Sequence, residues 1–204
     1  MTLFGFEVSV DASWLLLSVL IAWTLAVSIF PGIVPGLTAA GYWSMAVLGT
    51  AGLMFSIVFH ETAHSLVARH YGLPIRGITL FIFGGVAEMS DEPARLRDEL
   101  LTAAAGPAAS ILLAAIVQAL LYGAAAWGGS IAVAGTLWYL ALINFLLGLF
   151  NLIPAFPLDG GQMFRAALWS WRGDLIWGYP HCRRCGQSVW RIADPVWPAW
   201  RAAR

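Results

Sequence analysis

The sequence predicts an α-helical polytopic membrane protein with about four transmembrane helices and a small β-sheet or hairpin at the cytoplasmic rim. Composition is the first reason: 60% of the 204 residues are hydrophobic and 11% are charged, whereas about a quarter are charged in soluble proteins. The formal net charge is zero, so no basic surface is available to hold a nucleic acid through its phosphates. We therefore expect contact with the lipid bilayer and no nucleic-acid partner.

The second reason is the presence of four long apolar stretches, because a membrane helix needs roughly 20 such residues. They lie at about 13–30, 43–59, 100–122 and 131–150, and the second is expected to continue as a helical span over about 43–70. Together they leave too little polar sequence to cover them in water. The first stretch is expected to stay in the mature protein, since Glu7 and Asp11 precede it without a basic residue and no small-residue cleavage site follows.

Arginine placement predicts the orientation, because short cytoplasmic loops collect basic residues. The chain has no lysine, and its arginines before the last thirty residues lie between the second and third stretches or after the fourth: Arg69, Arg76, Arg95, Arg97, Arg165 and Arg172. The connections 31–42 and 123–130 carry no charge. The protein is therefore expected in the cell membrane with both termini and the 71–99 segment in the cytoplasm.

Two segments have the pattern of strands. Residues 3–11 alternate between apolar and polar side chains, and residues 78–89 are rich in β-branched and aromatic side chains around Gly84 and Gly85. We expect them to pair as a small sheet at the cytoplasmic rim. An edge strand of such a sheet can receive an extended peptide, and a purely structural hairpin is the open alternative.

A zinc-hydrolase pattern follows the second apolar run directly. Residues 60–64 read His-Glu-Thr-Ala-His, which is H-E-x-x-H. On a helix, residues four apart share a face, so His60 and His64 can bind one zinc ion while Glu61 takes a proton from water. Two structural histidines are the alternative, which is disfavoured because ionisable residues are costly at the end of a membrane helix.

A zinc site needs a third protein ligand, and His70 is one candidate. Related zinc proteases place a histidine at this spacing after a glycine turn, but Val67 occupies the glycine position here. If the helix continues to Gly72, His70 lies about 9 Å along the axis beyond His64. His70 is therefore interpreted as an interfacial residue, with Gly72 and Leu73 ending the helix.

Asp159 is the better third ligand. It is the only carboxylate in the long stretch 100–173, and it lies in a segment, residues 151–161, that contains two prolines and two glycines. These residues break the fourth helix and allow close backbone approach, so the segment can bring one carboxylate to a metal on a facing helix. Asp159 could also cap the following helix, and different carboxylate oxygens could serve both roles.

These residues together resemble the site-2 protease family of intramembrane zinc metalloproteases, peptidase family M50. The resemblance covers roughly residues 3–172 and rests on H-E-x-x-H at the end of a span, followed about ninety residues later by N-x-x-P-x-x-P-L-D-G-G. It implies one zinc ion per chain, with His60, His64 and Asp159 as ligands and Glu61 as general base.

Further positions follow from the same resemblance. Asn151 would bind substrate or a developing oxyanion, and Gly84 and Gly85 belong to the strand that resembles the family's substrate-binding edge. Gly106, in a third-span segment that also looks like the family's, is a further candidate for contact with substrate or the oxyanion. For Ser110, in the same span, plain helix packing is the favoured interpretation.

The resemblance implies an intramembrane zinc endopeptidase that hydrolyses a peptide bond within or near a transmembrane segment of a membrane protein, in regulated intramembrane proteolysis. The alternative from another class is a non-catalytic membrane protein that binds zinc or a transmembrane partner. Glu61 discriminates between the two, because a binding protein needs no general base between its ligands.

The last part of the chain differs from the rest. Residues 1–172 are predicted to form the protease core, and residues 173–204 form an atypical tail with five arginines and four tryptophans. Cys182 and Cys185 give half of a zinc-ribbon pattern without a second pair. The subtype that the core resembles often carries C-terminal CBS domains, which this sequence lacks. The hypothesis that follows is a truncated chain, read in a shifted frame from Cys182.

Overall fold

The computed structural model describes residues 2–3, 6–73, 75–81, 84–89 and 96–172. Within these residues, four helical segments are long and apolar enough to cross a membrane: Ala12–Ile33, Ala39–His70, Leu96–Ala126 and Ile131–Asn151. The polytopic helical fold that the sequence predicts is confirmed. Each segment extends a few residues beyond the apolar stretch that predicts it at one end or both, into flanking residues that are mostly small or polar.

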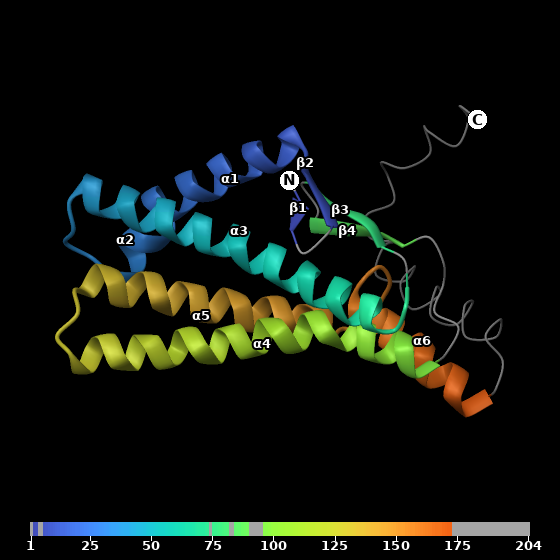
Figure 1. Ribbon diagram of the computed structural model, residues 1–204. Helices are drawn as coiled ribbons and strands as arrows, with labels where there is room; N and C mark the ends of the chain where they lie inside the picture. Colours follow the sequence, from blue (N-terminus) through green and yellow to red (C-terminus); the bar gives the residue numbers. More distant parts are fainter. Residues whose placement is uncertain (1, 4–5, 74, 82–83, 90–95, 173–204) are drawn as a thin grey trace, which may run out of the picture.

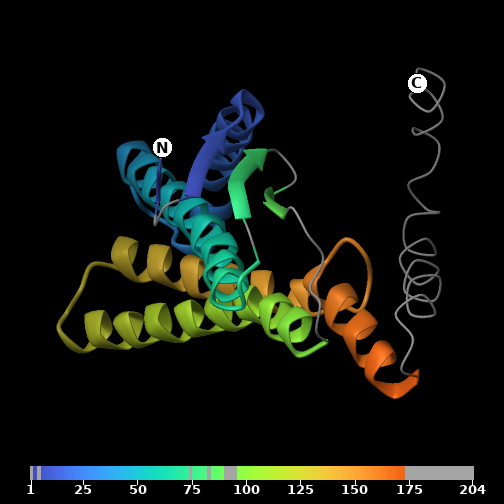
Figure 2. The same cartoon turned by 45° about the vertical axis from the view of Figure 1, so that its right-hand side comes forward.

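The first segment consists of three helical pieces, α1 (Ala12–Thr24), the π-helical η1 (Leu25–Ile29) and α2 (Phe30–Ile33). The others are α3 (Ala39–His70), α4 (Leu96–Ala126) and α5 (Ile131–Asn151). In Figures 1 and 2, α4 and α5 run side by side in opposite directions, and α3 crosses them. Phe30 packs edge-on against Tyr139, with ring centroids 5.6 Å apart, in a core that joins the first segment to α3 and α5.

Local sequence signals set the helix ends. Asp11 accepts a hydrogen bond from the Ser13 amide at 2.8 Å and so caps α1. At its other end, α3 stops at His70 because Gly72 adopts a φ of +77°, and the Leu73 amide donates to the Ala68 carbonyl at 3.0 Å. The predicted stop signal after His70 is therefore confirmed, and α3 is a continuous helix through both histidines of the motif.

A four-stranded sheet lies at the end of the molecule where α3 stops (Figure 1). Its order is β1 (Thr2–Leu3), β2 (Phe6–Val10), β3 (Ile75–Phe81) and β4 (Gly84–Met89). The two predicted segments pair, since β2 runs parallel to β3 and β3 runs antiparallel to β4. The predicted limits were wrong in part: Leu3 belongs to β1, Phe6–Val10 form β2 and Asp11 caps α1, while the second segment begins at Ile75.

The helix α6 (Asp159–Arg172) closes the same end of the molecule. The connection from α5, residues 152–158, packs closely on the start of α6. A Cβ at Gly160 would overlap the Leu152 carbonyl, and one at Gly161 would lie 2.8 Å from the Ala155 carbonyl oxygen. Glycine is therefore required here by space. The predicted tail, residues 173–204 with Cys182 and Cys185, lies outside the described residues.

Candidate metal centre

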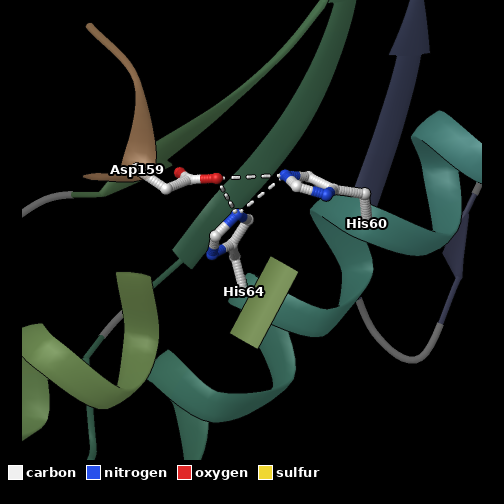
Figure 3. Close-up of side chains that lie close together, drawn as sticks. All are labelled: His60, His64 and Asp159. Carbon is white, nitrogen blue, oxygen red and sulfur yellow. Dashed lines mark hydrogen bonds and ion pairs between the residues drawn. The ribbon is translucent and has the colours of Figure 1, made fainter. Parts of the chain in front are cut away.

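Three side chains meet where α3 faces the start of α6 (Figure 3). The distance between His60 Nε2 and Asp159 Oδ2 is 3.2 Å, and that between His64 Nε2 and Asp159 Oδ2 is 3.3 Å. The two Nε2 atoms lie 3.2 Å apart. Both histidines are buried, and Asp159 is mostly buried. The two imidazoles lie about one helical turn apart on α3, and the break in the chain before α6 brings the Asp159 carboxylate to them.

The outer nitrogens of both rings are held by α4. His64 Nδ1 donates to the Thr102 carbonyl oxygen at 2.7 Å, and His60 Nδ1 lies 2.9 Å from the Ser110 hydroxyl. A carbonyl oxygen can only accept, so the proton of a neutral His64 must be on Nδ1. Its Nε2 then presents a lone pair toward Asp159. Such outer hydrogen bonds fix the tautomer and ring orientation of metal-binding histidines.

The donor set fits a tetrahedral metal ion. Zinc binds histidine nitrogen and carboxylate oxygen at about 2.0–2.2 Å, which places neighbouring tetrahedral ligands roughly 3.3–3.5 Å apart. The three separations here are 3.2, 3.2 and 3.3 Å. Burial raises the pKa of the Asp159 carboxyl, but the hydrogen bond from His60 and the electrostatic influence of both imidazoles outweigh this effect, so its pKa lies below the ordinary value. The carboxylate form, which binds cations, is favoured.

Gly106 of α4 forms the wall next to the two rings. A Cβ at this position would overlap His64 Nε2 and lie 2.6 Å from His60 Nε2. A side chain of any size would therefore occupy the space beside the two nitrogens. The sequence predicts Gly106 as a substrate or oxyanion residue, and the structure places it directly against the two histidines.

The other predicted residues lie around this group. Glu61 follows His60 on α3 and is partly buried. Asn151 is the last residue of α5, and its Nδ2 donates to the Leu147 carbonyl of the same helix at 2.9 Å. His70 lies at the end of α3, six residues beyond His64, and is exposed. The exclusion of His70 as third ligand thus agrees with its position in a continuous helix.

Gly84 and Gly85 begin β4, where they pair with Phe81 and Leu80 of β3. In the sheet order, β4 is the last strand, and it packs against α3. The predicted strand therefore lies at an edge of the sheet, beside the helix that carries the two histidines.

Two contributions of α4 were missed by the sequence analysis. The sequence favours helix packing for Ser110, yet its hydroxyl lies 2.9 Å from His60 Nδ1. The Thr102 carbonyl that accepts from His64 is a backbone group, so no residue type marks it in the sequence. Arg165 was counted as a loop arginine, but it is buried in an ion pair with Glu99. The one feature of the sequence that could have indicated a role for Ser110 at the site is its spacing of four residues from Gly106, which places both on the same face of α4.

Comparison with known proteins agrees with the geometry. The family model for peptidase family M50 matches residues 48–128 and 123–177, which include the three clustered side chains and most of the chain. The chain belongs to peptidase family M50. The resemblance drawn from the two motifs is therefore confirmed.

Relatives and a solved structure resemble this M50 chain over nearly its whole length. The putative zinc metalloprotease Rip3 of Mycobacterium tuberculosis is 40% identical over 91% of this chain and 47% of its own length. The putative zinc metalloprotease sll0528 of Synechocystis is 34% identical over 96% of this chain and 50% of its own length. The M50 chain thus spans about half the length of these relatives.

The site-2 protease from Methanocaldococcus jannaschii is the structural counterpart. It aligns with a TM-score of 0.62 and 28% sequence identity, over 94% of this M50 chain and 80% of that chain. The similarity supports the helical membrane fold described above.

Proposed function

We propose that this M50 chain is an intramembrane zinc endopeptidase that holds one zinc ion with His60, His64 and Asp159. The observation that carries the proposal is the triangle of ligand atoms, with sides of 3.2–3.3 Å, next to the carboxylate-bearing Glu61. The relatives' names, zinc metalloprotease and site-2 protease, support the same assignment. The protease core corresponds to residues 1–172.

The residues of the chain have separable roles in peptide hydrolysis. Zinc, when bound, would supply a Lewis acid that polarises the scissile carbonyl and makes water easier to deprotonate. Glu61 takes the proton from the attacking water and passes it to the leaving nitrogen. Asn151 donates an amide hydrogen to substrate or to the oxyanion. Its Nδ2 carries two hydrogens, and one of them is used in the hydrogen bond to the Leu147 carbonyl.

The proposed substrate is a membrane-spanning protein. A transmembrane helix hides its carbonyls in internal hydrogen bonds, so the cleaved segment must unwind and find other backbone partners. The edge strand β4, which begins at Gly84 and Gly85, offers backbone groups for such a segment. Gly106 leaves the space beside the histidines open.

The proposed location is the cell membrane, with both termini in the cytoplasm. Arg69 and Arg97 are exposed at the end of the molecule that carries the site, as expected for cytoplasmic loops. Arg165 gives weaker support for this orientation, because it is buried against Glu99. Labelling of a cysteine introduced at Gly128, in a chain whose Cys182 and Cys185 are replaced by serine, with a membrane-impermeant thiol reagent tests the orientation: reaction from the cytoplasmic side alone would contradict it.

Metal removal tests the function. We expect a chelator to reduce cleavage of a reconstituted transmembrane substrate to background and zinc to restore it, because the ligands then hold an ion again. The variant Asp159→Ala should contain little zinc and recover no activity. The matched control is Asp98→Asn, which removes a carboxylate from α4 outside the ligand group. Full cleavage by zinc-free protein would refute the proposal.

Loss of the Ser110 hydroxyl is expected to weaken zinc binding. Because Ser110 lies 2.9 Å from His60 Nδ1 and is 1% exposed, Ser110→Ala should raise the zinc dissociation constant about 10–100-fold, as for other outer-sphere partners. Competition with a chromophoric chelator measures this constant. Ser56→Ala is the matched control, since the hydroxyl of this buried serine donates to the Gly52 carbonyl of its own helix. Equal zinc affinity in the two variants would contradict the role of Ser110.

A further inference from the structure

A buried ion pair joins α4 to α6 near the metal centre. Arg165 Nε donates to Glu99 Oε1 at 2.6 Å, and the two side chains are 9% and 2% exposed, respectively. We refer to these two residues as the α4–α6 ion pair. A buried charge is costly unless it is paired and hydrogen-bonded. The position of α6 is therefore tied to that of α4 through this contact.

Each partner of the pair lies near a residue of the metal centre on its own helix. Arg165 follows Asp159 by six residues, or about 9 Å along the α6 axis. Glu99 precedes Thr102 by three residues, about one helical turn, and the Thr102 carbonyl accepts the hydrogen bond from His64. Through the α4–α6 ion pair, the helix that orients the histidines also holds the helix that carries the carboxylate.

The start of α6 needs such a second attachment. Asp159 is the first residue of α6, and it follows a connection, residues 152–158, that contains Pro154 and Pro157. The close packing of Gly160 and Gly161 on residues 152–158 holds the first turn of the helix, so the tilt of α6 about that turn depends on its contacts with α4. A metal-binding side chain must be held within roughly 0.5 Å of its productive position. The ion pair, about 9 Å further along the helix, restrains that tilt.

We propose that Glu99 and Arg165 are positioning residues that hold α6 so that Asp159 Oδ2 meets the two histidine nitrogens. This inference rests on the proposed zinc site. Buried ion pairs are often replaced by well-packed apolar residues without loss of stability. The effect of the pair should therefore show in the geometry and affinity of the metal site more than in the stability of the fold.

The test replaces both charges at once in the full-length protein. The double variant Glu99→Leu/Arg165→Met removes both charges of the pair together, so neither is left in the interior without the other. We expect its metal-free melting temperature to stay at or above that of the wild type. Cobalt should bind about 10–100-fold more weakly, as when an outer-sphere partner is lost, and the visible absorption bands of tetrahedral cobalt should be weaker or shifted. Arg97→Met, at an exposed arginine of α4, is the matched control.

The outcomes separate positioning from a purely structural role. A folded double variant with the cobalt affinity and spectrum of the wild type would overturn the proposal. If the double variant does not fold, Arg165→Lys keeps the charge but not the planar guanidinium, and its unchanged cobalt affinity and spectrum would equally overturn it. Failure of the wild type to bind zinc or cobalt would instead overturn the proposed metal site, and this inference with it.

Discussion

Replacing Glu61 with glutamine is expected to lower the rate of substrate cleavage about 10²–10⁴-fold, the usual contribution of a general base. Glutamine keeps the shape of the side chain but cannot accept a proton from water. Glu61 is not among the three converging ligand residues, so the zinc content should remain that of the wild type. The expected result is thus a protein that binds zinc as the wild type does but hardly cleaves the substrate.

The measurement compares wild type and Glu61→Gln in vesicles that contain a membrane-spanning substrate, with zinc content determined on the same samples. Glu61→Asp serves as the matched variant, because it keeps a carboxylate but withdraws it by one methylene group, and an intermediate rate is expected. Equal product from wild type and Glu61→Gln would reject the catalytic assignment. It would indicate a non-catalytic membrane protein that binds zinc or a transmembrane partner.

Adding a single methyl group at Gly106 is expected to abolish tight zinc binding. The Cβ of Gly106→Ala would overlap His64 Nε2 and lie 2.6 Å from His60 Nε2. Neither ring can withdraw easily, because Thr102 and Ser110 of the same helix hold their outer nitrogens. The zinc dissociation constant should therefore rise by at least about 100-fold, the upper end for loss of an outer-sphere partner.

The matched control for this prediction is Gly123→Ala on the same helix, where an added Cβ would have no atom within 4 Å. Alanine should stabilise this exposed helical position by roughly 0.5–1 kcal/mol, with wild-type zinc affinity. Overpacking at Gly106 should cost about 1–3 kcal/mol of unfolding free energy. Zinc titration and thermal unfolding of both variants separate the two effects. Tight zinc binding by folded Gly106→Ala would contradict the prediction, because it would show that the imidazole rings of His60 and His64 can move away from the added methyl group.

Much of the site could be predicted from local sequence. The spacing of His60 and His64 is enough to place them on one helical face, because the helix repeat is fixed by backbone geometry. The proposed third ligand, Asp159, could be predicted because it is the only carboxylate in a long apolar stretch and because prolines and glycines break the helix before it. Helix ends at Asp11 and Gly72 follow from capping rules that act over a few residues.

The surroundings of the ligands could not be predicted in the same way. Ser110 reads as an ordinary small residue of a membrane helix, and only the rotation of α4 about its axis turns it toward His60. The hydrogen bond from His64 ends on the Thr102 carbonyl, a backbone group that every residue possesses. Arg165 and Glu99 are 66 residues apart, so no periodicity relates them.

The sequence by itself determined the membrane setting, the four spans, the family and the three residues that converge. Each of these depends on composition or on spacing within one element, which the chain expresses locally. Only the tertiary structure decided which face of α4 meets the histidines, why Gly106 can have no side chain, and how α6 is attached. These features depend on the axial offset and rotation of helices that pack together, and many distant residues set those quantities jointly.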